Sequence, residues 1–208
     1  ASDVYKRQVD RYFKTVEKLG VVNDQKGLDF FITESDHVNL PEHGITTPFI
    51  AFSIGAQFAT KRLTKEKIVS LISKINAPVV LLGGPGDKEV GEFITEQSKN
   101  NTINLCGELS LNQSASVLKQ SAKVVSHDTG LMHIASAFQK EIISIWGNTV
   151  PALGMYPYLP QEGSKYSIHE VELSCRPCSK IGYQQCPKKH FKCMENQDLE
   201  TISKTINQ

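Results

Sequence analysis

The sequence predicts an α/β fold in which helices cover both faces of a parallel sheet. Between residues 49 and 146, short apolar segments alternate five times with amphipathic ones, and the connections are short. The apolar segments are continuous runs, as expected of strands that are buried on both faces. The chain of 208 residues is 39% hydrophobic and 22% charged, which is enough to bury such a core.

The predicted strands and helices follow one another in order. The strands are expected at residues 49–54, 78–82, 103–105, 123–126 and 141–146. Thr64 is a candidate cap of the first helix of the repeat, and Ser110 with Gln113 has the pattern of a capping box. A helix is expected at residues 131–138, and Asp198 is a candidate cap of a last amphipathic helix.

Two regions flank this repeat. Residues 1–48 are weakly patterned, apart from an amphipathic helix at 9–19, and they are expected to form a linker. Residues 49–208 are expected to form one Rossmann-like domain, in which residues 151–194 break the strand–helix pattern. The Cys-rich segment 173–194 belongs to that domain.

Composition limits the classes of function. Lys and Arg number 23 and Asp and Glu 22, so the net charge of +1 argues against a nucleic-acid partner bound by bulk charge. No apolar run approaches the ~20 residues that cross a bilayer, and no signal-peptide pattern opens the chain. The first residue is Ala1, so the chain is expected to be a processed product or a part of a longer one.

Four of the five cysteines are clustered, at positions 175, 178, 186 and 193. Cys175, Cys178, Cys186 and Cys193 could supply four ligands to a structural zinc ion, but the second pair is widely spaced. Packed or oxidised thiols are therefore favoured over zinc, and no other metal site is expected. The nearby Lys180, Lys188, Lys189 and Lys192 are either a contact for a phosphorylated partner or a solvated face, and the second interpretation is favoured.

Ligands of open parallel sheets bind at the loops that follow the strands. Thr129 and Gly130 would lie in the first turn of a helix, where free N–H groups and the helix dipole attract phosphate. Lys61, in a small-residue loop after the first strand, fits contact with a diphosphate. The structural alternatives are that Asp128 caps the helix, that His133 only packs, and that Lys61 is solvated.

Residues 83–87 form a glycine-rich turn that resembles a nucleotide loop. The dinucleotide fingerprint fails because Glu89 stands at its third glycine position, so a dehydrogenase is not expected. Asp87 or Glu89 could bind a ribose hydroxyl, or the segment could be a tight turn with a helix cap. P-loop, nucleophile-elbow and Asp-x-Asp patterns are absent from the sequence.

Taken together, these segments resemble the C-terminal half of the lipopolysaccharide heptosyltransferases, glycosyltransferase family 9. The resemblance covers about residues 9–195. The segments that carry it are residues 9–12, 55–62, 81–84, 107–111, 124–133, 146–149 and 175–194.

The resemblance implies a GT-B architecture, with the active site between two Rossmann-like domains and this chain as the C-terminal, nucleotide-sugar-binding one. Residues 1–48 would then include the remnant of the interdomain connection. The donor-binding residues that it implies are Thr60, Lys61, Asp87, Glu89, Leu109, Asp128, Thr129, Gly130, Leu131 and His133. The general base and the acceptor site would lie in an N-terminal domain, which has no counterpart here, so no catalytic residue is assigned.

The resemblance further implies an inverting, metal-independent glycosyltransferase that needs no cofactor. Its donor would be a nucleoside-diphosphate sugar such as ADP-heptose, and its acceptor a lipopolysaccharide core or a related glycan. The enzyme would be cytoplasmic or peripheral to the inner face of the cytoplasmic membrane, where the glycolipid acceptor lies. The alternative is a non-catalytic module, either a nucleotide sensor or a zinc-stapled adaptor.

Overall fold

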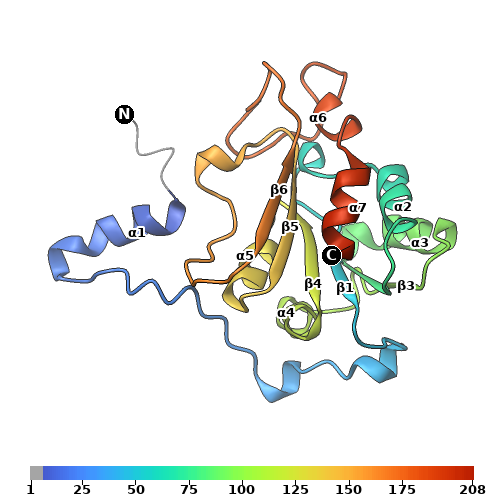
Figure 1. Cartoon of the computed structure of the whole chain (residues 1–208), viewed down its shortest axis with the longest axis horizontal. Helices are drawn as coiled ribbons and strands as arrows, with labels where there is room; N and C mark the ends of the chain where they lie inside the picture. The colour runs from blue at the N-terminus through green and yellow to red at the C-terminus, as the bar shows by residue number, and fades with distance from the viewer. Residues whose placement is uncertain (1–6) are drawn as a thin grey trace.

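The computed structural model describes residues 7–208 and contains one six-stranded, entirely parallel sheet (Figure 1). The order of the strands is β3-β2-β1-β4-β5-β6. Their bounds are β1 Ile50–Ser53, β2 Val79–Leu82, β3 Thr102–Asn104, β4 Lys123–His127, β5 Glu141–Trp146 and β6 Tyr166–Glu170. The predicted α/β fold is therefore confirmed.

Helices cover both faces of the sheet, as predicted. Their bounds are α2 Lys65–Ile72, α3 Lys88–Gln97, α4 Leu111–Gln120, α5 Gly130–Ala137 and α7 Leu199–Asn207. Helices α2, α3 and α7 pack on one face and α4 and α5 on the other (Figure 1). Successive strand residues point to opposite faces, so Phe52 packs with the first group and Ala51 with the second.

The expected caps form. Thr64 Oγ1 accepts a hydrogen bond from the N–H of Lys67 at 3.4 Å, at the start of α2. Ser110 and Gln113 exchange both bonds of a capping box, at 3.1 and 2.9 Å. Asp198 Oδ1 accepts from two N–H groups of the first turn of α7. These local signals were sufficient to set the helix starts.

The sixth strand, β6, lies in the region that the sequence predicted to break the pattern. It pairs in parallel with β5 at the edge of the sheet, and its residues alternate between exposed and half-buried. An edge strand with one exposed side lacks the continuous apolar run that marks the buried strands. Residues 151–194 therefore add a strand to the sheet as well as the Cys-rich segment.

The N-terminal region divides into two parts. Helix α1 (Gln8–Val16) has no buried residue and lies apart from the sheet (Figure 1). A short 3-10 turn then ends at Gly20, whose φ of +75° is a left-handed cap. Further on, Val38, Leu40 and Ile45 are buried in the core on the α4 side. The later part of residues 1–48 thus packs on the domain that it precedes.

The remaining elements are short. The 3-10 helices are η2 Glu17–Leu19, η3 Glu34–Asp36, η4 Leu40–His43, η5 Ala59–Lys61, η6 Pro85–Asp87 and η7 Pro151–Leu153, and α6 spans Lys192–Glu195. Two of them, η5 and η6, lie in the loops that follow β1 and β2. They shape the site described next.

Candidate functional site

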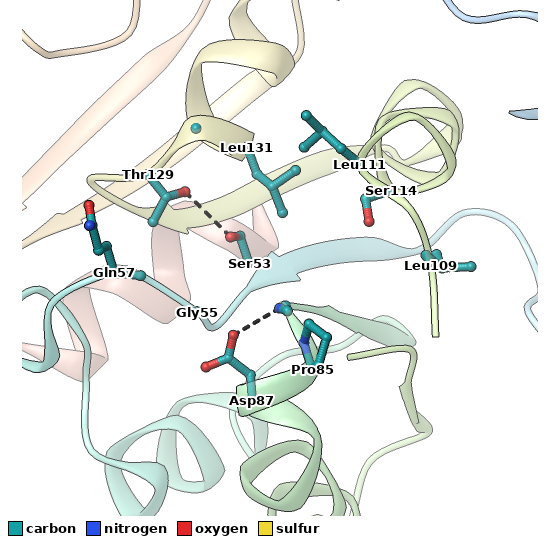
Figure 2. Close-up of a pocket in the computed structure, with 14 residues that line it drawn as sticks. Ser53, Gly55, Gln57, Pro85, Asp87, Leu109, Leu111, Ser114, Thr129 and Leu131 are labelled. Carbon is teal, nitrogen blue, oxygen red and sulfur yellow. Dashed lines mark hydrogen bonds between the residues drawn. The ribbon is translucent and has the colours of Figure 1, made fainter. Parts of the chain in front are cut away.

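A cavity of about 470 Å³ opens at the carboxyl ends of β1, β2 and β4 (Figure 2). This is the point where the order of the strands reverses, since β1 has β2 on one side and β4 on the other. The cavity is lined by Ser53, Gly55, Ala56, Gln57, Gly83, Gly84, Pro85, Asp87, Leu109, Leu111, Ser114, Thr129, Gly130 and Leu131. Ligands of open α/β sheets bind in such a crevice.

The cavity has an apolar end and a polar end. Leu109, Leu111 and Leu131 come from the loop before α4, from α4 and from α5, and their side chains flank one end (Figure 2). Thr129 lies at the other end, beside Gln57 (Figure 2), and Gly130 follows it in the chain and also lines the cavity. This division suits a ligand with a flat apolar group at one end and an anionic group at the other.

The polar end is built on the first turn of α5. Thr129 is the N-cap of the helix, and Gly130 is its first residue. A Cβ added at Gly130 would meet nothing within 4 Å, so the space in front of this turn is open. The Thr129 hydroxyl is 3.2 Å from that of Ser126 and 3.5 Å from that of Ser53. The free N–H groups of the turn and these hydroxyls gather hydrogen-bond donors at this end of the cavity, as helix N-termini that bind anions do.

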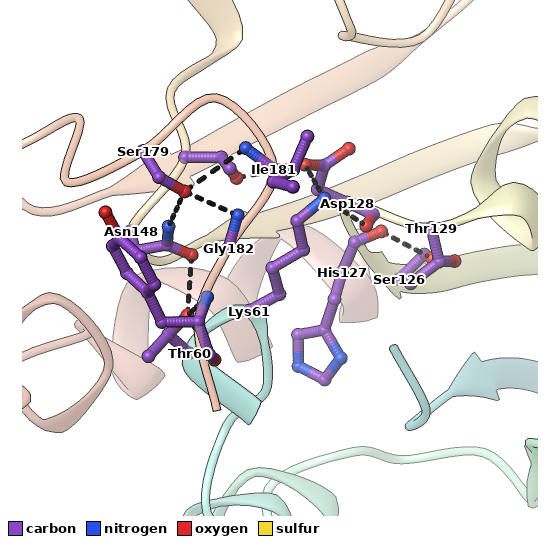
Figure 3. Close-up of polar contacts among 12 residues, drawn as sticks. Thr60, Lys61, Ser126, His127, Asp128, Thr129, Asn148, Ser179, Ile181 and Gly182 are labelled. Atoms are coloured by element: carbon purple, nitrogen blue, oxygen red, sulfur yellow. Dashed lines mark hydrogen bonds and ion pairs between the residues drawn. The ribbon is translucent and has the colours of Figure 1, made fainter. Parts of the chain in front are cut away.

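Lys61 lies beside this turn, where it contacts Asp128 (Figure 3). Its Nζ is 2.7 Å from Asp128 Oδ2, and the two side chains are only 14% and 6% exposed. Thr149, which follows β5, donates its hydroxyl to the same carboxylate oxygen at 2.9 Å. Asp128 therefore holds Lys61 next to the helix start and is itself held by Thr149.

Asp87 joins the loops that follow β1 and β2. Its Oδ2 accepts from the N–H of Gly84 at 2.9 Å, and its Oδ1 lies 3.0 Å from Arg62 Nη1. A Cβ at Gly55 would stand less than 3.0 Å from this carboxylate. Asp87 thus lines the cavity and also links the two loops that form its walls. Glu89, the other candidate for ribose contact, is exposed and does not line the cavity.

Thr60 is buried and faces the Cys-rich segment. Its hydroxyl accepts from the N–H of Tyr183 at 2.8 Å and has two acceptors in reach, Asn148 Oδ1 at 3.0 Å and the Tyr183 carbonyl at 2.9 Å (Figure 3). Its own N–H donates to the same carbonyl. Thr60 therefore fixes the loop that positions Lys61, and it does not line the cavity.

His133 lies on α5, one turn after Gly130, and lines a separate depression together with residues of α1. Burial is the main cause that lowers its pKa; nearby Asp128 acts in the opposite direction. The structure thus places His133 near Asp128 and Lys61, on the α1 side of the helix.

His127, the last residue of β4, is fully buried. Its Nε2 accepts the N–H of Leu63 at 3.1 Å, and burial, with the nearby Arg62, lowers its pKa to about 3. His127 is therefore a neutral structural residue behind the site.

The four clustered cysteines are free thiols. Cys175 Sγ lies 3.8 Å from His190 Nε2, and the Cys178 thiol donates to the carbonyl of Cys175. Within residues 7–208, no group of three or more His, Cys, Asp or Glu side chains has a geometry that could hold a metal ion. Over the same residues, no helix is both long and apolar enough to traverse a bilayer.

Ser53 and Ser114 of the site were not singled out in the sequence, whereas Gln57, Leu111 and Thr149 lie in segments that carry the family resemblance. Ser53, Gln57, Leu111 and Ser114 line the cavity, and Thr149 orients Asp128. Ser53 and Thr149 follow directly from their places at strand ends, since the carboxyl ends of β1 and β5 meet at one edge of the sheet. The structure brings together Asp87, Leu109, Thr129, Gly130 and Leu131 in the cavity, with Lys61 and Asp128 beside it.

The fold and the cavity define an open, doubly wound α/β domain with a ligand crevice at its switch point. The sequence profile of glycosyltransferase family 9 (heptosyltransferase) matches residues 1–189. The chain belongs to this family.

Individual relatives agree with this assignment. The chain is 31% identical over 129 residues to lipooligosaccharide heptosyltransferase 2 of Haemophilus influenzae, a match that covers 58% of this chain and 36% of that protein. Its fold is similar to that of a family 9 glycosyl transferase from Veillonella parvula, with a TM-score of 0.79 and 23% identity, covering 96% of this chain and 58% of the other.

A second solved structure is similar in fold, the E. coli heptosyltransferase WaaC with ADP. The TM-score is 0.58 and the identity 21%, and the match covers 80% of this chain and 52% of that one. The chain thus spans little more than a third of the curated relative and about half of these structures.

Proposed function

We propose that this chain is the donor-binding half of an inverting glycosyltransferase that transfers heptose from ADP-heptose to a lipopolysaccharide core or a related glycan. One observation carries the proposal: an open helix N-terminus with Thr129 and Gly130, flanked by Lys61, at the polar end of a cavity whose other end is apolar. A nucleoside diphosphate has matching parts, a flat base and a charged diphosphate. The ADP in the WaaC structure supports the same ligand class.

In this proposal the diphosphate lies at the first turn of α5, and the base lies among Leu109, Leu111 and Leu131. Departure of the sugar leaves negative charge on the nucleoside diphosphate. The ammonium of Lys61 and the N–H groups at Thr129 and Gly130 would stabilise that charge, which is the task a metal ion performs in other transferases. This is the basis for proposing a metal-independent reaction.

An inverting transfer also needs a base that takes the proton of the acceptor hydroxyl. In the family architecture the base comes from the N-terminal domain, so we propose that this chain binds the donor and transfers sugar only together with such a domain. Transfer to a glycolipid acceptor, at the cytoplasmic face of the membrane, belongs to the same proposal.

Isothermal calorimetry with ADP and ADP-heptose tests donor binding directly. The parent chain should bind both. Lys61→Ala should lower the affinity for ADP by about tenfold or more, since a charged hydrogen bond is worth about 1.5–3 kcal/mol. Lys67→Ala, on α2 and outside the cavity, is the matched control. A folded parent chain with no measurable nucleotide affinity would contradict the proposal.

A further inference from the structure

The Cys-rich knot, defined as residues 173–194, carries a charge unlike that of the rest of the chain. Five of the 23 Lys and Arg residues lie in it and none of the 22 Asp and Glu, which leaves 18 cations against 22 acids elsewhere. Arg176 is turned inward, where it pairs with Glu170 and donates to backbone carbonyls. The other four are Lys180, Lys188, Lys189 and Lys192.

These four lysines are exposed, and none of them makes a side-chain ion pair or hydrogen bond with the residues that the structure describes. Elsewhere, Lys61, Lys74 and Lys123 each contact a carboxylate. The knot therefore presents concentrated positive charge that the fold itself does not use. Such clusters attract anionic surfaces at distances up to the Debye length.

The knot is held firmly at the rim of the site. The N–H of Tyr183 donates to the hydroxyl of Thr60, and the N–H of Thr60 donates to the carbonyl of Tyr183. Ser179 Oγ accepts from the N–H of Gly182 at 2.6 Å (Figure 3). The contact between Cys175 and His190 joins the first arm of the knot to the second. The segment that carries the four lysines is thus joined within itself and to the loop that carries Lys61.

Two large hydrophobic side chains of the knot are exposed as well. Ile181 is 62% exposed and Tyr183 is 42% exposed, and Lys180 directly precedes them. Lysines beside exposed aliphatic and aromatic side chains are the combination that binds a membrane interface, where the cations meet headgroups and the apolar groups enter the boundary with the acyl chains. A nucleic acid would use the lysines and gain little from an exposed isoleucine, so the combination favours a lipid surface.

We propose that the exposed face of the Cys-rich knot docks on an anionic lipid bilayer. Lys180, Lys188, Lys189 and Lys192 contact the headgroups, while Ile181 and Tyr183 insert at the boundary. This docking rests on the proposed function, which puts the acceptor in a membrane, and names the surface of this chain that meets the lipid; it does not depend on donor binding. It would hold the mouth of the cavity close to the membrane surface, because Thr60 joins the knot to the loop after β1.

Co-sedimentation of the whole chain with lipid vesicles tests the proposal. The chain should bind vesicles of phosphatidylcholine with phosphatidylglycerol, fail to bind phosphatidylcholine alone, and dissociate at high ionic strength. The triple variant Lys188→Glu, Lys189→Glu, Lys192→Glu should lose at least about a hundredfold in partition coefficient, since each lysine near an anionic surface contributes about 1 kcal/mol and the glutamates are repelled. Ile181→Asp should lose binding without any change in lysine content.

The matched control is Lys26→Glu, Lys88→Glu, Lys99→Glu, which changes three exposed lysines elsewhere by the same charge. Its binding should stay within a few-fold of the parent. Three results would overturn the proposal: no binding of the parent to anionic vesicles, an equal loss in the control variant, or equally tight binding to single-stranded RNA. ADP titration of the same preparations separates such a failure from a failure of donor binding.

Discussion

The ammonium of Lys61 lies 2.7 Å from Asp128 Oδ2, so the cation beside the helix N-terminus has a carboxylate partner within the protein. An incoming diphosphate must either share Lys61 with Asp128 or take it over. Because Thr149 holds the same carboxylate oxygen, Asp128 keeps a hydrogen-bond donor when Lys61 moves away. In the proposed function, this pair would therefore set the affinity of the site for the diphosphate.

Asp128→Asn should therefore strengthen ADP binding. The substitution removes a negative charge near the proposed diphosphate position and releases Lys61, and we expect a gain of about tenfold, or about 1.4 kcal/mol. Calorimetry with ADP at two ionic strengths measures the effect. Asp29→Asn, at an exposed position, is the control for net charge. A loss of ADP affinity would show instead that the carboxylate orients Lys61 for the ligand.

Gly55→Ala should destabilise the domain and distort the cavity. The new Cβ would stand less than 3.0 Å from the Asp87 carboxylate, which is held in place by Gly84 and Arg62 and cannot move freely. Overpacking of this kind costs about 1–3 kcal/mol in the free energy of unfolding. Urea denaturation measures the loss.

Gly86→Ala is the matched control, because a Cβ at Gly86 meets nothing within 4 Å. Gly86 also has no positive φ, so alanine fits its backbone. Equal stability of the two variants would contradict the role that we give to the contact between Gly55 and Asp87.

The sequence was informative where a structure depends on neighbouring residues. The buried strands β1, β2, β4 and β5 are each built around a short apolar run, and the capping box at Ser110 is a local pattern, so both could be predicted. Strand β6 could not, because its edge position leaves it without an apolar run. Short strands with polar residues are recognisable only from the partner that they pair with.

The same limit applies to the site. That Thr129 and Gly130 begin a helix after a strand follows from their local sequence. The contact of Lys61 with Asp128 joins residues 67 positions apart and depends on the β1–β4 pairing, which no local pattern encodes. For the same reason the sequence could not show that the Thr60 hydroxyl bonds to Tyr183 and Asn148, and the donor contact that the resemblance implies for Thr60 stays a prediction.

Thr60→Val should loosen the Cys-rich knot. Valine has nearly the same shape as threonine but leaves the N–H of Tyr183 and the side chain of Asn148 without the hydroxyl, at a cost of about 1–3 kcal/mol. Hydrogen exchange at the Tyr183 amide should accelerate, and Thr60→Ser, which keeps the hydroxyl, should restore much of the protection. Unchanged exchange in Thr60→Val would mean that other contacts hold the knot.

His127 should make the stability of the domain sensitive to acid. Burial, with Arg62 nearby, lowers the pKa of His127 to about 3, whereas an unfolded chain protonates histidine at about 6.5. Below pH 6.5 the unfolded state therefore binds more protons, so the stabilisation is fully present above that pH and is lost as the pH falls toward 3. Within this window, His127 lowers the free energy of unfolding by about 1.4 kcal/mol for each pH unit of acidification.

His127→Asn separates this contribution from that of the carboxylates. The asparagine carbonyl can accept the N–H of Leu63, as His127 Nε2 does, but it takes up no proton. The variant should therefore lose less stability than the parent between pH 6.5 and 4.5, as measured by urea denaturation at each pH. His37→Asn, at an exposed position, is the matched control, and its curve should follow the parent. If the parent and His127→Asn curves run parallel through this range, the acid sensitivity arises elsewhere and His127 is not its source.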